Sequence, residues 1–250
     1  MKLKKLRMSA LLGVMLVFAL GTFAQTLPNN TSQAAIDAVV QNMQWTGQAS
    51  VRILSEGKVI YIDPFNVTDA DSADWVFITH SHGDHLSVAD LKKVVSSKTI
   101  VVAAAECEAM LRDNQFNVAH VAIPGQAFRA DGIDVQVVPA YTITKNTHPK
   151  ENNWVGYVLD FNGVKLYHPG DTQRIPEMKN IRCHIALMPL GQKYTMDTVD
   201  DAVAAILDLH PRVAIPFHYG LYEGTAADAQ YFKTALTNHG GVSVVLIEKK

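Results

Sequence analysis

The sequence predicts an α/β (α+β) fold in which β-sheets pack together and are covered by helices. Short runs rich in Val and Ile are numerous and come in long series before the helical segments. The helical segments lie at the edges of these series and near the end of the chain, an order that argues against one strictly alternating parallel sheet. Hydrophobic residues make up 48% of the 250 residues and charged residues 18%, enough apolar side chains for a sizeable core.

The individual elements follow from two periodicities. Runs of β-prone residues bounded by Gly, Pro, Asp or Asn predict strands at Ala49–Leu54, Val59–Ile62, Trp75–Thr79, Thr99–Ala103, Val118–Ile123, Ile133–Pro139, Trp154–Phe161, Val164–Tyr167, Ile185–Met188, Val213–Phe217 and Val242–Ile247. Apolar residues at helical spacing predict helices at Gln33–Met43, Val88–Val95, Glu106–Asn114, Thr198–Leu209 and Thr225–Asn238. We expect Asp197 to cap the fourth helix and Pro211 to end it.

The first 24 residues have the three parts of a secretory signal peptide. A basic stretch, Lys2–Arg7, precedes the 13-residue apolar run Met8–Leu20, and small residues at Thr22 and Ala24 fit a cleavage site after Ala24. The alternative, an uncleaved membrane anchor, requires about 20 apolar residues. We therefore expect residues 1–24 to be removed. Residues 25–250 would form one exported, periplasmic or secreted domain that does not span a membrane.

The charge balance argues against a nucleic-acid-binding protein. The chain has 22 Lys and Arg against 24 Asp and Glu, and four of the cations lie in the first 24 residues. The remaining 18 cations leave a net charge of −6, without the basic surface that nucleic acids attract. The two cysteines, Cys107 and Cys183, could form a disulfide in an oxidising compartment, but their apolar neighbourhoods favour two separate buried thiols.

One short segment carries most of the predicted chemistry. Directly after the apolar run 75–79 come four side chains that can bind a metal: His80, His82, Asp84 and His85. Gly83 permits a tight turn between them, so the last two can point in a different direction from the first two. Imidazole and carboxylate ligands together suit zinc, manganese or iron.

Three further potential ligands lie downstream. Asp171 and His218 each follow a predicted strand, and His148 lies in a polar stretch between two strands. Loops that follow strands commonly carry functional groups because a rigid sheet holds them in place. These positions therefore extend the candidate metal site beyond residues 80–85.

With these residues, the chain resembles the metallo-β-lactamase superfamily. The matching features are Asp63 after a strand, the motif at 80–85, Gly170-Asp171-Thr172, and His218 after a late strand. The stretches at 139–141, 148–150, 153–157, 166–172 and 214–220 resemble its ascorbate-6-phosphate lactonase-like and generic metal-dependent hydrolase branch. The resemblance extends from about residue 49 to 247. It implies a four-layer αβ/βα sandwich with two mixed sheets, helices on both outer faces and a metal site at one edge.

The resemblance also implies two divalent metal ions, expected to be zinc, with manganese or iron as alternatives. The first ion would be held by His80, His82 and His148, the second by Asp84, His85 and His218, and Asp171 would bridge them. Two cations about 3.5–4 Å apart can share one carboxylate and lower the pKa of a shared water toward neutrality. A bridging hydroxide would be the nucleophile, with Asp84 and Asp171 as the candidate catalytic residues.

Several assignments stay open at this point. His168 competes with His148 as the third ligand of the first ion. Asp63 is either an outer hydrogen-bond partner of a ligand histidine or a turn residue. Lys193 and Tyr194 could bind a substrate anion or lie in a solvated loop. Two other aromatic residues beside the site either line it or pack in the core, namely Tyr141 and Tyr219.

These observations together predict a binuclear metal-dependent hydrolase. Its substrate would be a small ester, lactone, amide or phosphoester. The first alternative is a mononuclear iron dioxygenase of the same fold, and the second is a non-catalytic metal-binding protein. The sequence carries no signal for an oligomeric state.

Overall fold

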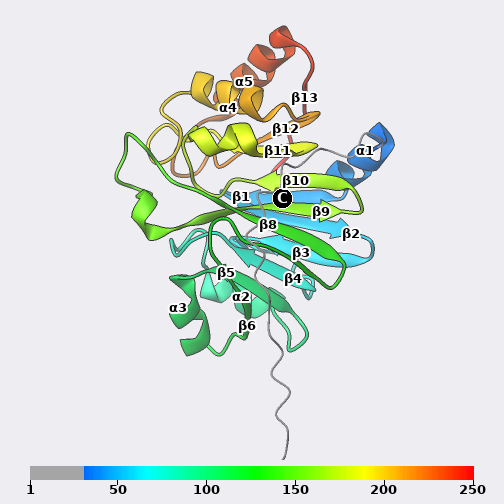
Figure 1. Ribbon diagram of the computed structural model, residues 1–250, viewed down its shortest axis with the longest axis vertical. Coiled ribbons are helices and arrows are strands. Elements are labelled where there is room, and N and C mark those ends of the chain that lie inside the picture. Colours follow the sequence, from blue (N-terminus) through cyan, green and yellow to red (C-terminus); the bar gives the residue numbers. More distant parts are fainter. Residues whose placement is uncertain (1–30) are drawn as a thin grey trace, which may run out of the picture.

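Two β-sheets pack against each other in the computed structural model, which describes residues 31–250 (Figure 1). The predicted signal peptide lies outside the described residues. The first sheet has the strand order β1-β2-β3-β4-β5-β6 and comprises β1 (Met43–Gly47), β2 (Ser50–Ser55), β3 (Lys58–Ile62), β4 (Trp75–Ile78), β5 (Ile100–Ala104) and β6 (Val118–Ala122). Its first three strands are antiparallel and β3 to β6 are parallel, so the sheet is mixed.

The second sheet has the order β13-β12-β11-β10-β9-β8-β7. It comprises β7 (Ala127–Ala130), β8 (Ile133–Pro139), β9 (Val155–Phe161), β10 (Val164–His168), β11 (Ile185–Pro189), β12 (Val213–Phe217) and β13 (Ser243–Val244). Here β7 to β10 are antiparallel and β10 to β13 parallel. Each half of the chain therefore runs from an antiparallel meander into parallel strands.

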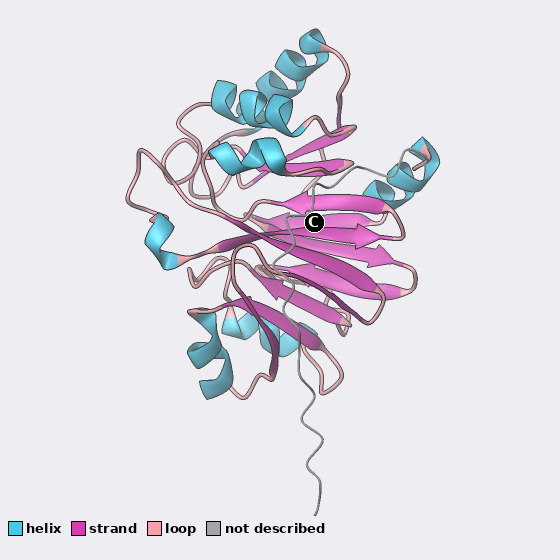
Figure 2. Cartoon of the chain, viewed as in Figure 1, coloured by secondary structure: helices cyan, strands magenta, loops and turns pink. Residues whose placement is uncertain are grey.

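Helices flank both sheets (Figure 2). They are α1 (Gln33–Gln41), α2 (Val88–Val94), α3 (Cys107–Asp113), α4 (Val199–Leu209) and α5 (Ala226–His239), with 3-10 turns η1 (Lys150–Asn152) and η2 (Pro176–Asn180). Helices α2 and α3 lie beside β4 to β6, and α4 and α5 lie beside β11 to β13 (Figure 1). None of the helices between residues 31 and 250 has the length and apolarity to cross a membrane.

The side chains of a strand alternate between the two faces of its sheet, so the parallel strands contribute residues to two separate apolar cores. In β11, Ile185 and Leu187 join the core between the sheets, while Ala186 and Met188 pack in the core beneath α4 and α5. Strand β4 is buried along its whole length, as expected for a central parallel strand covered on both faces.

Contacts between the sheets fix the loop that carries the metal-binding motif. The Tyr157 hydroxyl on β9 donates a 2.7 Å hydrogen bond to the carbonyl of Ile78, and its ring packs against Phe77 with centroids 5.1 Å apart. Phe77 and Ile78, which make these contacts, come three and two residues before His80 in the chain. The second sheet therefore holds the end of β4 in place.

The αβ/βα sandwich predicted from the sequence is confirmed, with differences in three elements. Strand β1 begins at Met43, where the apolar spacing had predicted the last residue of a helix. Helix α1 instead ends at Gln41, and Asn42 caps it. The short edge strand β7 was not predicted, because its four residues contain few β-prone side chains. Strand β13 is shorter than predicted, since only Ser243 and Val244 pair with β12.

The expected helix cap at Asp197 is wrong by one residue. Thr198 caps α4, and its hydroxyl accepts a hydrogen bond from the Asp201 amide. Asp197 instead accepts hydrogen bonds from the Thr144 hydroxyl. The same Thr-x-x-Asp pattern caps α5 at Thr225.

The two cysteines are separate buried thiols. Cys107 belongs to the larger apolar cluster, which includes residues of both sheets and of α2 and α3. Cys183 lies in the core beneath α4 and α5, and both thiols are free. Burial raises the pKa of the Cys183 thiol to about 12, so this thiol is protonated at neutral pH.

Candidate metal centre

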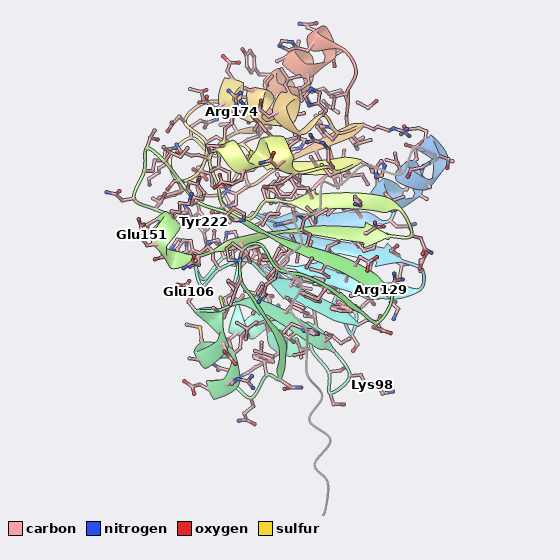
Figure 3. All side chains as sticks on the ribbon, in the orientation of Figure 1. Lys98, Glu106, Arg129, Glu151, Arg174 and Tyr222 are labelled. Atoms are coloured by element: carbon pink, nitrogen blue, oxygen red, sulfur yellow. The ribbon has the colours of Figure 1, made fainter. Side chains whose placement is uncertain are left out.

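All seven predicted ligands lie in loops that follow strands, at one end of the sandwich. Four are in the loop after β4, one is in the loop after β8, one follows β10 and one follows β12: His80, His82, Asp84, His85, His148, Asp171 and His218. In Figure 3, Tyr222 and Glu151 mark this end, and Arg129 lies at the opposite end of the sheets. The topology thus brings together residues from both halves of the chain.

These side chains form two sets of three. In the first set, His80, His82 and His148 present potential ligand atoms within 4.8 Å of one another. In the second set, Asp84, His85 and His218 do the same. The division coincides with the one that the family resemblance implies.

Asp171 lies between the two sets. Its Oδ1 atom is 3.3 Å from His85 Nε2 and 3.2 Å from His218 Nε2, both in the second set. Its Oδ2 atom is 3.2 Å from His148 Nε2 in the first set. The two carboxylate oxygens therefore face different sets. The turn that places Asp171 there requires a glycine at position 170. Gly170 has a φ of +63°, and a Cβ on it would stand only 2.8 Å from the Val155 carbonyl oxygen.

The donor atoms fit divalent cations. His85 Nε2, His148 Nε2 and Asp171 Oδ1 are buried and have no hydrogen-bond partner, although they lie close to one another. Buried polar atoms without partners are costly, and a cation at the centre of the cluster would satisfy them. Nitrogen and carboxylate oxygen ligands without a thiolate suit zinc, manganese or iron.

The electrostatics of the two sets differ. Burial, reinforced by neighbouring histidines, holds the pKa of His80 well below its ordinary value and also lowers that of His82. Burial opposes the charged form of His218 too, but the Asp171 carboxylate outweighs it and raises its pKa to about 9. Asp171 and Asp63 likewise outweigh burial at His85 and raise its pKa.

Asp63 is an outer hydrogen-bond partner of His85. It is fully buried, and its Oδ2 accepts a 2.7 Å hydrogen bond from His85 Nδ1. The Thr79 amide and hydroxyl donate to the same carboxylate at 2.8 and 2.6 Å. Because a carboxylate only accepts, His85 must carry its proton on Nδ1, which leaves Nε2 free for a metal.

The structure places His148, and not His168, in the cluster. His148 Nδ1 lies 3.2 Å from the Tyr194 carbonyl, which again directs the Nε2 lone pair toward the site. Both ring nitrogens of His168 are engaged by the backbone, with Nε2 2.8 Å from the Ala49 carbonyl and Nδ1 accepting from the Gly170 amide. His168 therefore joins the two sheets and has no free ligand atom.

Glu223 was not identified from the sequence. Its side chain is buried, and Oε1 lies 3.0 Å from His218 Nδ1. Oε2 accepts hydrogen bonds from the Lys193 and Tyr194 amides at 2.9 and 2.6 Å. Gly191 leaves room for it, since a Cβ there would overlap the carboxylate. In the sequence alone, no motif distinguishes Glu223 from the other acidic residues of loops.

Two other residues beside the ligands were also missed. Trp154 packs on the first set, with its ring centroid 4.6 Å from that of His80 and 4.9 Å from that of His82. The Gln48 side-chain amide donates to Asp84 Oδ2 at 3.3 Å. Gln48, like Asp63 and His218, has a positive φ, so the backbone is strained at three positions around the site.

A cleft of about 530 Å³ opens onto the cluster. Five of the predicted ligands line it, together with Gly83, Phe65, Thr147, Tyr194 and Tyr222. Tyr194 thus lines the site, whereas the Lys193 ammonium lies 4.5 Å from the centre of the Tyr194 ring.

Tyr141 and Tyr219 are not among the residues that line this cleft. The Tyr141 hydroxyl donates to Glu177 at 2.8 Å, and the Tyr219 ring packs against Trp45. Tyr141 and Tyr219 therefore pack within the protein and do not line the site.

Comparison with known proteins places the chain in a family. Residues 42–218 match the model of the beta-lactamase superfamily domain. A UPF0173 metal-dependent hydrolase of Thermoplasma acidophilum is 33% identical over 217 residues, covering 82% of this chain and 94% of that protein. A crystal structure described as a candidate metal-dependent hydrolase from Parabacteroides distasonis is 30% identical, with a TM-score of 0.73 over 83% of this chain and 93% of that one.

A more distant structure shares the fold alone. CmlA, a diiron β-hydroxylase of Streptomyces venezuelae, is 14% identical, with a TM-score of 0.65 over 82% of this chain and 52% of that chain. The chain therefore belongs to the metallo-β-lactamase superfamily, among its metal-dependent hydrolases.

Proposed function

We propose that this protein is a binuclear hydrolase that cleaves a small ester, lactone, amide or phosphoester. One observation carries the proposal: the two oxygens of Asp171 face different ligand sets, Oδ1 toward His85 and His218 and Oδ2 toward His148. A carboxylate in this position can be shared by two cations. A single metal site would not need two complete sets of donors on either side of it.

The protein's own residues have distinct tasks in this proposal. His80, His82 and His148 would hold one cation, and Asp84, His85 and His218 the other. When bound, a pair of divalent cations acidifies a shared water and polarises the carbonyl or phosphoryl oxygen of the substrate. Asp63 and the Tyr194 carbonyl fix the tautomers of His85 and His148, so that their Nε2 atoms face the site.

Asp84 is the second carboxylate with access to the substrate. It lines the cleft and is only partly buried, with the Gln48 amide holding one of its oxygens. In this position it can accept a proton from water and pass it to the leaving group. The Trp154 ring packs against the rings of His80 and His82 and helps to hold their orientation.

A mononuclear iron dioxygenase is the second candidate. His80, His85 and Asp171 also lie within ligand distance of one another, and two histidines with one carboxylate is the combination typical of non-haem iron oxygenases. This alternative predicts one ion per chain and consumption of oxygen.

We propose in addition that the protein acts after export. The support is the basic, apolar and small-residue pattern of residues 1–24. N-terminal sequencing of the protein from a periplasmic fraction tests it: a chain that begins at Gln25 is expected, and a chain that retains Met1 would contradict export with cleavage.

Metal content decides between the two candidates. Elemental mass spectrometry of the purified protein should find about two zinc or manganese ions per wild-type chain. Asp171→Asn keeps the shape of the side chain and should lower that number, whereas the exposed carboxylate change Asp113→Asn should not. One iron per chain, unaffected by Asp171→Asn, would overturn the binuclear proposal.

A further inference from the structure

The cleft above the candidate ligands has an aromatic and uncharged wall. Apart from ligands and Gly83, the residues that line it are Phe65, Thr147, Tyr194 and Tyr222. They come from the loops after β3, β8, β11 and β12. No lysine or arginine is among the described residues that line the cleft.

Tyr222, which lines the cleft, is also exposed to solvent. Its side chain is 52% exposed, and Leu221 beside it in the chain is 45% exposed. Large apolar side chains that are exposed together are typical of ligand-binding surfaces. In Figure 3, Tyr222 stands at the end of the sandwich where the site loops meet.

The lysines of the neighbouring loops contact other groups of the protein and are not among the residues that line the cleft. Lys145 donates to the carbonyls of Gln192, Thr195 and Met196 at 2.9, 2.7 and 2.5 Å. Lys193 lies over the Tyr194 ring, and Lys150 donates to Glu177 at 3.1 Å. A phosphate or carboxylate on a substrate, outside the reacting group, would therefore meet no cationic side chain in the cleft wall.

From this lining we propose that the cleft accepts uncharged esters or lactones that carry an aryl group, in preference to phosphorylated or otherwise anionic substrates. The proposal rests on the hydrolytic function proposed above and narrows its substrate class. In the reaction, the oxygen of water forms a bond to the acyl carbon and the bond from that carbon to the ester or lactone oxygen breaks. One proton of water ends on that oxygen, as an alcohol or a phenol, and the other is released from the carboxylic acid.

Three esters with one acyl group test the proposal. Phenyl acetate offers an uncharged ring, 4-acetoxybenzoate offers the same ring with a carboxylate, and methyl acetate has no ring. We expect kcat/KM for phenyl acetate to exceed that for 4-acetoxybenzoate at least about 10-fold, because the anion loses its water without gaining a partner. Equal rates, or a preference for 4-acetoxybenzoate, would overturn the proposal.

Two matched tyrosine variants test whether Tyr222 contacts the aryl ring of the substrate. Tyr222→Ala should lower kcat/KM for phenyl acetate about 10-fold, mainly through KM, and lower that for methyl acetate less than about threefold. Tyr231→Ala, half-exposed on α5 and bonded to Asp200, removes the same side chain away from the cleft and should change neither. Equal losses for both esters in Tyr222→Ala would contradict a ring-binding role.

Failure of this inference can be told apart from failure of the proposed function. If protein that carries two metal ions hydrolyses a phosphoester or an amide but no carboxylic ester, only the substrate class falls, and if it hydrolyses none of these compounds, both proposals fall. If esters are hydrolysed without preference for the uncharged ring, only the substrate class falls. Saturation-transfer NMR with benzyl alcohol gives a reading that does not depend on turnover, and transfer to the ring should weaken in Tyr222→Ala and not in Tyr231→Ala.

Discussion

The first and second ligand sets lie side by side, but the protein supports them differently. In the first set, the outer nitrogens meet neutral groups: His80 Nδ1 is 3.0 Å from the Thr79 hydroxyl and His148 Nδ1 is 3.2 Å from the Tyr194 carbonyl. In the second set, buried carboxylates stand behind the histidines, Asp63 behind His85 and Glu223 behind His218. Outer carboxylates make an imidazole a stronger ligand.

Each set also has one ligand that reaches the solvent. His82 of the first set is exposed at the cleft and Asp84 of the second set is partly exposed, whereas the other histidines of both sets are buried. The main difference between the two sets is therefore the charge of the groups behind them. We expect the second set to hold its cation more tightly and the first set to exchange its cation more readily.

Stepwise removal of metal is the strongest test of this difference. Dialysis against rising chelator concentrations should release one ion per chain before the other, and hydrolysis should be lost entirely with the first ion because both are needed. Loss of a cation bound at 100 times its Kd removes about 3 kcal/mol of stability, roughly 5–10 °C in Tm for a domain of this size.

The order of release identifies the set. His82→Ala removes a ligand of the first set alone, so this variant should retain one ion with the slower release. If the wild-type protein loses both ions in one step, the two sets are equivalent and the comparison fails.

Asp63→Asn should be the most damaging change in the outer partners. It keeps the shape of the side chain but removes the charge behind His85, and losing such a partner lowers metal affinity about 10–100-fold. Titration calorimetry should show the weaker affinity for one ion, with the other within about threefold of wild type. A uniform loss at both ions would indicate that Asp63 supports the whole loop after β4.

Glu223→Gln should act in the same direction with a smaller effect. The amide can still accept from the Lys193 and Tyr194 backbone, so we expect about 10-fold weaker binding of one ion. Glu177→Gln, which changes a carboxylate bonded to Tyr141 and Lys150, is the matched control and should leave both affinities unchanged. If Glu223→Gln leaves both metal affinities unchanged, Glu223 does not support a metal ligand.

Proton release gives the smallest and most specific signal. In the metal-free protein the pKa of His218 is about 9, so at pH 7.5 a cation entering the second set must displace its proton. Burial holds the pKa of His80 and His82 low, so these two ligands of the first set are already deprotonated. Calorimetry in buffers of different ionisation enthalpy should count more protons released for the ion that enters the second set than for the other ion.

The same shift sets the stability of the metal-free protein. A pKa raised from 6.5 to about 9 stabilises the folded state fully below pH 6.5, and this contribution is lost as the pH rises through 9. The Tm of metal-free protein should therefore fall between pH 6.5 and 9.5. A rising Tm over that range would contradict the charged state of His218.

Most of the ligands were accessible from the sequence, whereas the choice of His148 and the division into two sets followed from the family resemblance. Of the outer partners, only Asp63 was named, as one of two alternatives. His80 to His85 follow an apolar strand in a compact motif, and Asp171 and His218 stand at strand ends, so residue type and position indicated them. Glu223 and Gln48 become recognisable only when the loops after β1 and β12 are brought together in space. Strand β7 was missed for a related reason, since pairing with β8 and not intrinsic propensity makes Ala127–Ala130 a strand.

The distribution of the ligands along the chain has a consequence for how the protein acquires metal. Residues from His80 to His218 meet only after both sheets have packed, with the Tyr157 hydroxyl on the Ile78 carbonyl joining them behind the motif. An unfolded chain offers only the ligands of the local motif at 80–85, which bind a cation more weakly and less selectively than the full set. Zinc, manganese and iron all suit the completed donor set. We therefore expect the identity of the bound cation to depend on which of these metals is available where the chain completes its folding.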